Sequence, residues 1–308
     1  METIISADHL GKCYGSFRAL KGVSFSVRRG ECFGFLGHNG AGKSTTMRMV
    51  YGLSTVEEGS LSLFGQSVFL TPPSIKAKMG VVPQEDNLDA ELSVIENLEI
   101  YGGLFGLNRK NARTRGYELL DFMGLSNKAH DQVDHLSGGL KRRLVIARSL
   151  INHPKLVILD EPTTGLDPEA RHLVWQKLRS LKAEGVTLLL TTHYMEEASQ
   201  LCDRLVLMHE GLILAEGSPL ELVKNHVLPN AIEVRMPMDR LPSGFEDKII
   251  SAGGEVLQVA DGLFLYAIDG EGLWNSLDTW GVPRHACFLR ASTLEDVFLK
   301  LTGRGPEI

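Results

Sequence analysis

A glycine-rich segment between an apolar run and a helical stretch constrains the fold of this chain most strongly. Residues 37–44 read Gly-His-Asn-Gly-Ala-Gly-Lys-Ser and fit the pattern G-x-x-x-x-G-K-[ST]. The apolar run at 32–36 precedes them, and a helix is expected to begin near Lys43. A strand, a glycine-rich loop and a helix in this order open a β-α-β unit, which predicts an α/β fold.

The residue types of this loop suit the binding of phosphate groups. Glycines let the backbone turn its N–H groups inward, and the following helix presents the positive end of its dipole to the same place. Lys43 adds a mobile cation, and Ser44 offers a hydroxyl to Mg²⁺. A chance match is expected in roughly one chain in a hundred of this length. We therefore expect ATP with Mg²⁺ here, bound by Gly37, His38, Asn39, Gly40, Ala41, Gly42, Lys43, Ser44 and Thr45.

Two acidic residues, Asp160 and Glu161, end a second apolar run at 156–159. Mg²⁺ on a nucleotide needs an acidic partner near the loop serine, and Asp160 fits that role. Glu161 is then placed to polarise an attacking water. Two acids after a strand could equally begin a surface loop, but the phosphate-binding pattern upstream favours the catalytic interpretation.

Composition limits the function classes. The chain has 308 residues, of which 43% are hydrophobic and 23% charged, so it can hold one large domain and a small one, or two medium ones. A net charge of −6 argues against a nucleic-acid partner. Its four cysteines form no CxxC pair and are expected as reduced cytoplasmic thiols. No apolar run approaches the roughly 20 residues of a membrane helix, so any membrane role is expected to need a partner.

The spacing of apolar runs predicts the domain organisation. Runs at 81–82, 156–159 and 186–190, separated by helical stretches, predict a mostly parallel sheet covered by helices. Residues 91–151 look helical and predict an inserted helical lobe. Within it, the apolar run 98–107 is either lobe core or a groove for a helix of a membrane partner. Composition changes near 227–230, so we expect a nucleotide-binding domain at 1–228 and a small α+β domain at 229–308.

Residues 136–140, Leu-Ser-Gly-Gly-Leu, resemble the LSGGQ signature of ABC transporter ATPases. Ser137, Gly138 and Gly139 open a helix, which gives a second N-terminus suited to an anion. An ordinary serine cap would look similar, but the position shortly before Asp160 is where the family has its signature. Leu140 replaces the usual glutamine, as is common in the nodulation-like branch, and so does not indicate inactivation. His38 stands where proline is commoner.

Other family motifs follow in order. Gln84 matches the Q-loop glutamine, 165–167 matches the D-loop, and His193 after a β-like run matches the switch histidine. Tyr14 resembles the aromatic residue that stacks on adenine, although Phe17 could take its place. The resemblance implies a catalytic set of Glu161, His193 and Gln84, a metal set of Ser44, Gln84 and Asp160, and further nucleotide contacts from Tyr14, Ser137, Gly138, Gly139 and Asp167.

Segments 82–89, 136–144, 196–198 and 294–303 are similar to the nodulation-I and daunorubicin-resistance branch, which powers ABC-2 type exporters. The resemblance implies a P-loop NTPase core and an ATP-hydrolysing subunit. That subunit is expected in the cytoplasm, peripheral on the inner face of the membrane and bound to permease subunits. The cargo would be a lipo-oligosaccharide, a polysaccharide or a drug. It also implies a head-to-tail homodimer, in which the phosphate loop of one copy and 137–139 of the other hold each ATP.

Two other functions fit the sequence less well. A soluble ABC protein acting on ribosomes or DNA usually carries two ATPase cassettes or a long coiled coil, and neither is evident here. A nucleotide-binding module without turnover is disfavoured because Glu161 and His193 are both present. The basic run 141–143 could be a nucleic-acid patch, but a solvated face or general attraction for ATP fits an acidic chain better.

Overall fold

The computed structural model describes residues 2–237, 240–259 and 262–303. Its contacts divide the chain into two compact units, Met1–Ile213 and Leu214–Ile308. Each unit has its own hydrophobic core. Among the described residues, no helix combines the length and the apolar character that crossing a membrane requires.

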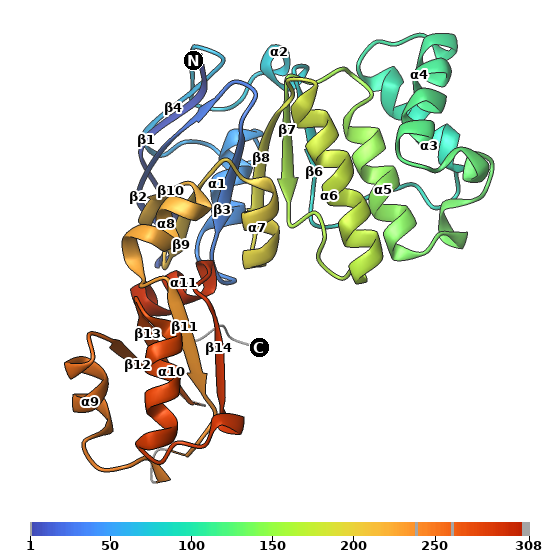
Figure 1. The fold of residues 1–308 in the computed structure, drawn as a ribbon. Helices are drawn as coiled ribbons and strands as arrows, with labels where there is room; N and C mark the ends of the chain where they lie inside the picture. Colours follow the sequence, from blue (N-terminus) through green and yellow to red (C-terminus); the bar gives the residue numbers. More distant parts are fainter. Residues whose placement is uncertain (1, 238–239, 260–261, 304–308) are drawn as a thin grey trace. The chain divides into compact units, whose positions relative to one another are not determined.

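Five strands of a six-stranded sheet lie wholly within the first unit and form its centre (Figure 1). Its order is β10-β9-β3-β8-β7-β6, where β9, β3, β8, β7 and β6 pair in parallel. Strands β3, β7 and β8 are buried along their whole length, as expected for parallel strands covered on both faces. The strands are β3 (Cys32–Leu36), β6 (Met79–Val82), β7 (Leu156–Asp160), β8 (Thr187–Thr192), β9 (Arg204–His209) and β10 (Leu212–Gly217).

A four-stranded antiparallel sheet with the order β2-β1-β4-β5 packs against this centre. It consists of β1 (Thr3–Tyr14), β2 (Phe17–Arg28), β4 (Glu58–Leu63) and β5 (Gln66–Val68). Phe25 of this sheet contacts Phe35 of β3 edge to face, with 4.9 Å between ring centroids. Helix α1 (Lys43–Val50) adds Met47 to the same core. Strands β1 and β2 are each 12 residues long and are joined by a short turn.

A helical lobe lies between β6 and β7 in the sequence, as predicted. It contains α3 (Val94–Leu104), α4 (Arg109–Phe122) and α5 (Gly138–Ser149), and Figure 1 shows α3 and α4 beyond α5 on the side away from β1 and β2. Side chains cap each helix start, because Ser93, Asn108 and Ser137 accept hydrogen bonds from backbone N–H groups of the first turn. Outside the lobe, the first unit also contains α2 (Pro73–Lys76), α6 (Pro168–Ala183) and α7 (Met195–Leu201).

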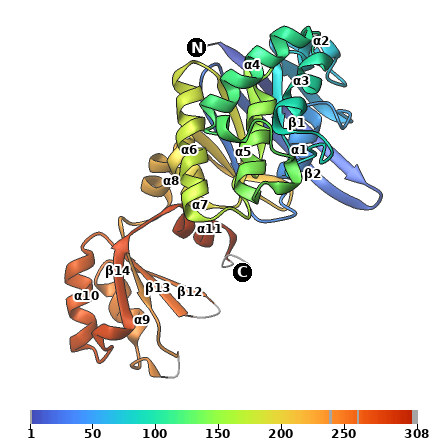
Figure 2. The same ribbon diagram turned by 90° about the vertical axis from the view of Figure 1, so that its right-hand side faces the viewer.

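The second unit is an α+β fold, as expected for the end of the chain. Its antiparallel sheet has the order β12-β13-β11-β14, and Figure 2 shows α10 alongside β14. The elements are α8 (Pro219–His226), β11 (Asn230–Val234), α9 (Phe245–Ser251), β12 (Glu255–Val259), β13 (Gly262–Ala267), α10 (Gly270–Thr279), β14 (Cys287–Ala291) and α11 (Leu294–Thr302). Because α8 packs against α11, it groups with this unit, whereas the boundary expected from the sequence lies after α8.

Candidate functional site

The loop between β3 and α1 has the backbone shape that its glycines suggested. Gly40 and Gly42 have φ angles of 82° and 103°, in the left-handed region that favours glycine. A Cβ atom on Gly37 would lie 2.2 Å from the carbonyl oxygen of Met208, so only glycine fits there. The loop therefore curls closely over the carboxyl end of β3 and begins α1 at Lys43.

Lys43 lies folded back into this loop. Its side chain is 4% exposed, and its Nζ donates to the carbonyl oxygens of Gly37 at 2.7 Å and His38 at 3.0 Å. Burial lowers the pKa of the ammonium group, while the carboxylates of Glu161 and Asp160 act in the opposite direction. A buried cation beside inward-turned backbone is suited to phosphate oxygens.

Ser44 and Asp160 meet as the sequence predicted. The Ser44 hydroxyl donates to Asp160 Oδ1 at 3.2 Å, and Thr191 Oγ1 donates to the same oxygen at 2.5 Å. Parallel pairing of β7 with β8 sets Asp160 opposite Thr191, which brings these groups together at the carboxyl ends of the strands. One carboxylate and one hydroxyl are oxygen ligands of the kind that Mg²⁺ uses when phosphates and water complete its shell.

Glu161 has a left-handed backbone, with φ of 49°, which is uncommon outside glycine. Its N–H donates to Thr191 Oγ1 at 3.0 Å, and its Oε2 accepts from Thr164 Oγ1 at 3.2 Å. Its Oε1 lies 3.3 Å from His193 Nδ1 and 3.8 Å from Lys43 Nζ. The side chain is buried, so these neighbours hold the carboxylate in one place.

A cavity of about 330 Å³ brings most of the predicted site together. Gln84 and Glu161 line it with the phosphate loop, and Tyr14 and Phe17 both lie at its wall, so either ring could contact a base. Gly37, His38, Asp160 and His193 do not line it but contact residues that do. Its lining is Tyr14, Phe17, Ala19, Asn39, Gly40, Ala41, Gly42, Lys43, Ser44, Thr45, Gln84 and Glu161.

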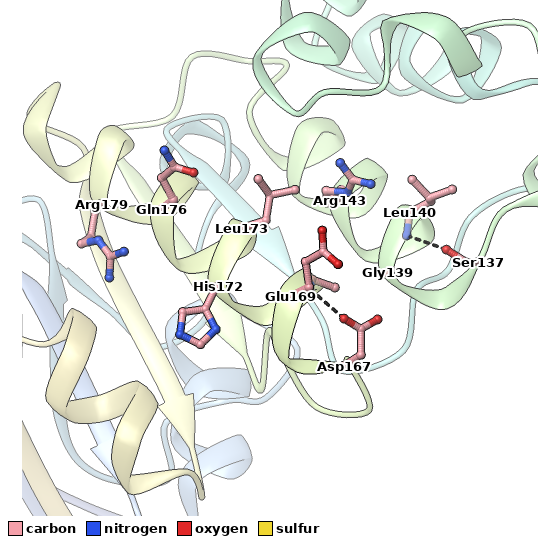
Figure 3. A pocket seen from close by; sticks show the side chains of 11 residues that line it. Ser137, Gly139, Leu140, Arg143, Asp167, Glu169, His172, Leu173, Gln176 and Arg179 are labelled. Carbon is pink, nitrogen blue, oxygen red and sulfur yellow. Dashed lines mark hydrogen bonds between the residues drawn. The ribbon is translucent and has the colours of Figure 1, made fainter.

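The signature segment borders a different cavity, of about 700 Å³ (Figure 3). Ser137, Gly139 and Asp167 line it, whereas Gly138 does not. Ser137 Oγ accepts from the N–H of Leu140, and Asp167 Oδ1 accepts from the N–H of Ala170, so both residues cap helices that begin beside the cavity. Within one chain, the signature segment and the phosphate loop thus belong to separate cavities.

The expectation that residues 141–143 form a solvated face is wrong for Arg142. Its side chain is 5% exposed, and it points from α5 to the carboxyl ends of β6 and β7, where it donates to backbone carbonyl oxygens. Charge alone gave no signal for this burial. Thr191 and Thr164 were also missed, because hydroxyl residues near strand ends are too common to indicate a role.

Two segments of the chain match known protein families. Residues 20–164 match the ABC transporter family, and residues 251–303 match the C-terminal domain of the nodulation factor export protein NodI. The first match contains the phosphate loop, Gln84, the signature segment and both strand-end acids. The second lies within the second unit.

Curated relatives match almost the whole chain. The Nod factor export ATP-binding protein I of Burkholderia orbicola is 46% identical and covers 95% of each chain. The protein of the same name from Ralstonia nicotianae is also 46% identical, over 98% of this chain and 94% of its own.

Solved cassettes match a shorter part. A dimeric ATP-binding cassette in a post-hydrolysis state, with ADP and Pi, is 27% identical with a TM-score of 0.65, over 70% of this chain and 98% of its own. A cassette of the cbiONQ transporter complex from Clostridium perfringens is 28% identical with a TM-score of 0.67, over 73% of this chain and 92% of its own.

Proposed function

The chain belongs to the ABC transporter ATP-binding proteins, and from this premise we propose how its residues couple ATP hydrolysis to export. It is an ATP-hydrolysing subunit of an exporter that works with a separate membrane component. The proposed complex is an ABC-2 type exporter. Because its relatives are Nod factor export proteins, we favour a lipo-oligosaccharide cargo over a polysaccharide or a drug. The proposed location is the inner face of the cell membrane, where the permease subunits would hold the chain.

The arrangement of Lys43, Ser44, Gln84 and Glu161 around one cavity is the observation that carries the proposal. The phosphate loop and Lys43 would hold the phosphates of ATP, and Tyr14 or Phe17 would contact adenine. Ser44, Asp160 and Gln84 would hold Mg²⁺, which neutralises phosphate charge when bound. The hydrogen bond from Ser44 to Asp160 supports this assignment, because it places two oxygen ligands side by side.

Glu161 is the proposed general base. Its Oε1 lies near Lys43, which would hold the phosphates, so a water on the cavity side of the carboxylate would stand in reach of the γ-phosphate. The carboxylate would accept the proton of that water. His193, at 3.3 Å from the same oxygen, would keep the carboxylate oriented and contact the γ-phosphate.

The separate position of the signature cavity supports a head-to-tail homodimer. In this proposal Ser137, Gly138, Gly139 and Asp167 of one copy would complete the ATP site of the other, using the start of α5 as an anion site. The dimeric cassette with ADP and Pi is a precedent for two such copies. The proposed domains are an ATP-binding domain at 1–228 and an accessory domain at 229–308, and no nucleic acid is expected as a partner.

Replacing Lys43 tests the binding part of the proposal. Lys43→Ala should weaken Mg-ATP binding by about 10- to 100-fold, because a hydrogen-bonded charge contributes about 1.5–3 kcal/mol. Isothermal titration with a non-hydrolysable ATP analogue measures this affinity. Lys182→Ala is the control, because Lys182 pairs with Asp203 at 2.8 Å and does not line the cavity. Unchanged affinity in folded Lys43→Ala protein would exclude this loop as the phosphate site.

A further inference from the structure

Arg142 makes an unusual set of contacts for a cation. Its Nε donates to the carbonyl oxygen of Pro162 at 2.7 Å, and its Nη2 donates to those of Asp160 and Glu161, both at 3.0 Å. Its Nη1 donates to the carbonyl oxygens of Pro83 at 2.5 Å and Gln84 at 3.4 Å. All three guanidinium nitrogens are therefore used on backbone.

These carbonyl groups belong to two segments that are far apart in the sequence. Pro83 and Gln84 follow β6, whereas residues 160–162 end β7 and continue beyond it. The side chains of Gln84 and Glu161 both line the cavity that holds the phosphate loop. One side chain thus fixes the backbone beneath both of them.

Arg142 is also part of the helix that starts at the signature segment. Helix α5 begins at Gly138 with Ser137 as its cap, and Ser137 and Gly139 line the second cavity. The guanidinium group also pairs with Asp86, whose Oδ1 lies 3.6 Å from Nη1. A rigid helix therefore joins the signature cavity to the residues under the first cavity.

We propose that Arg142 is a positioning residue that sets Gln84 and Glu161 for hydrolysis and ties their position to helix α5. This inference rests on the proposed ATPase function. The planar guanidinium group reaches several acceptors at fixed angles, which a lysine ammonium group does not reproduce. Without the guanidinium group, the segment after β6 and the segment at the end of β7 would shift relative to each other. A shift near 1 Å can lower a reaction rate by about 10²-fold. Arg142 does not line the cavity, so nucleotide affinity should not depend on it.

The test compares Arg142→Lys and Arg142→Gln with the wild-type chain. Single-turnover ATP hydrolysis should be about 10²-fold slower in both variants, whereas the Kd for Mg-ATP should stay within about threefold. Arg148→Lys is the matched control, because Arg148 is also buried on α5 and donates to the carbonyl oxygens of Asp86 and Asn87 but to none at the end of β7. It should keep its rate.

Asp86→Asn adds a variant that does not depend on replacing a buried arginine. It should slow hydrolysis by several-fold in the wild-type background and have no further effect in Arg142→Lys, because Asp86 would act only by holding Arg142 in place. Wild-type rates in folded Arg142 variants, an equal loss in Arg148→Lys, or additive effects of the Asp86 and Arg142 changes would overturn the inference. A wild-type chain that neither binds nor hydrolyses ATP would instead refute the proposed function.

Discussion

At the scale of single residues, some features of the site could be predicted from the sequence and others could not. Lys43, Ser44 and Asp160 could be assigned from their pattern, and they meet in the structure at hydrogen-bond distance or within one cavity. The left-handed backbone of Glu161 could not, because non-glycine residues rarely adopt it and nothing in the local sequence indicates it. The role of Arg142 was also hidden, since burial of a charged residue depends on tertiary contacts.

Asp296 shows a residue-scale constraint in the second unit. Its carboxylate accepts both Nη groups of Arg290, at 2.6 and 2.9 Å, the hydroxyl of Tyr266 at 3.0 Å, and the N–H of Thr293 at 2.7 Å. Burial by itself would raise the pKa of Asp296, but the hydrogen bonds from Arg290 and Thr293 outweigh it and lower the pKa. The network fixes the start of α11 to the sheet.

Asp296→Asn should therefore destabilise the second unit by about 2 kcal/mol at neutral pH, as expected for lost hydrogen bonds to a charged group. Because the folded-state pKa lies below the unfolded value of about 4, the stabilisation is complete above that value. It is lost as the pH falls through the folded-state pKa, so the difference between wild type and variant should shrink in acid. Urea unfolding followed by tryptophan fluorescence at several pH values measures this. Exposed Glu295→Gln is the control, and a difference independent of pH would contradict the assignment.

At the scale of elements, helix α3 divides the apolar residues of 98–104 between a buried side and an exposed side. Leu98 is buried in the lobe, and Tyr101 lies against Arg148, with the guanidinium carbon 4.9 Å from the ring centroid. Ile100 and Leu104, one turn apart, are 57% and 76% exposed. Part of the run is therefore core, and the other part is an apolar surface, which we expect to contact the permease.

Charged residues on that surface should disrupt membrane recruitment. Ile100→Asp and Leu104→Asp should each weaken docking by roughly 1.5–3 kcal/mol, the contribution of a buried aliphatic side chain. ATP binding should be unchanged, because neither residue lines the nucleotide cavity. Co-sedimentation with permease-containing membranes provides the measurement, with Leu220→Asp on α8, which is 79% exposed, as the control. Normal recruitment of both α3 variants would show that another surface docks.

Apolar runs indicated parts of the central sheet but not its complete order. The fully buried strands β3, β7 and β8 could be found as such runs, whereas the lobe was predicted only as one helical stretch at 91–151. The complete second sheet could not be foreseen, because β1 pairs both with β2, its neighbour across a short turn, and with β4, which follows β3 and α1 in the sequence. The grouping of helix α8 with the second unit, through its packing on α11, likewise could not be predicted from the sequence.

For the whole molecule, we propose that ATP bound at one phosphate loop brings two copies together and that Glu161 then starts hydrolysis. Two separate cavities in one chain, one with the phosphate loop and one with the signature segment, are what such a pair of copies would require. The resemblance to ABC transporter ATPases implied this arrangement, but the separation of the two cavities could be seen only in the folded structure.

The Glu161→Gln variant is the sharpest test of this mechanism, because it removes the proton acceptor and keeps the size of the side chain. Single-turnover hydrolysis should fall by on the order of 10²–10⁴, the usual contribution of a general base, while Mg-ATP binding persists. With hydrolysis blocked, size-exclusion chromatography should show a dimer with ATP and a monomer without it. Lys43→Ala should give no dimer under either condition. Near-normal turnover in the folded Glu161→Gln variant would contradict the role of Glu161 as general base. ATP binding without dimer formation would contradict the ATP-dependent pairing of two copies.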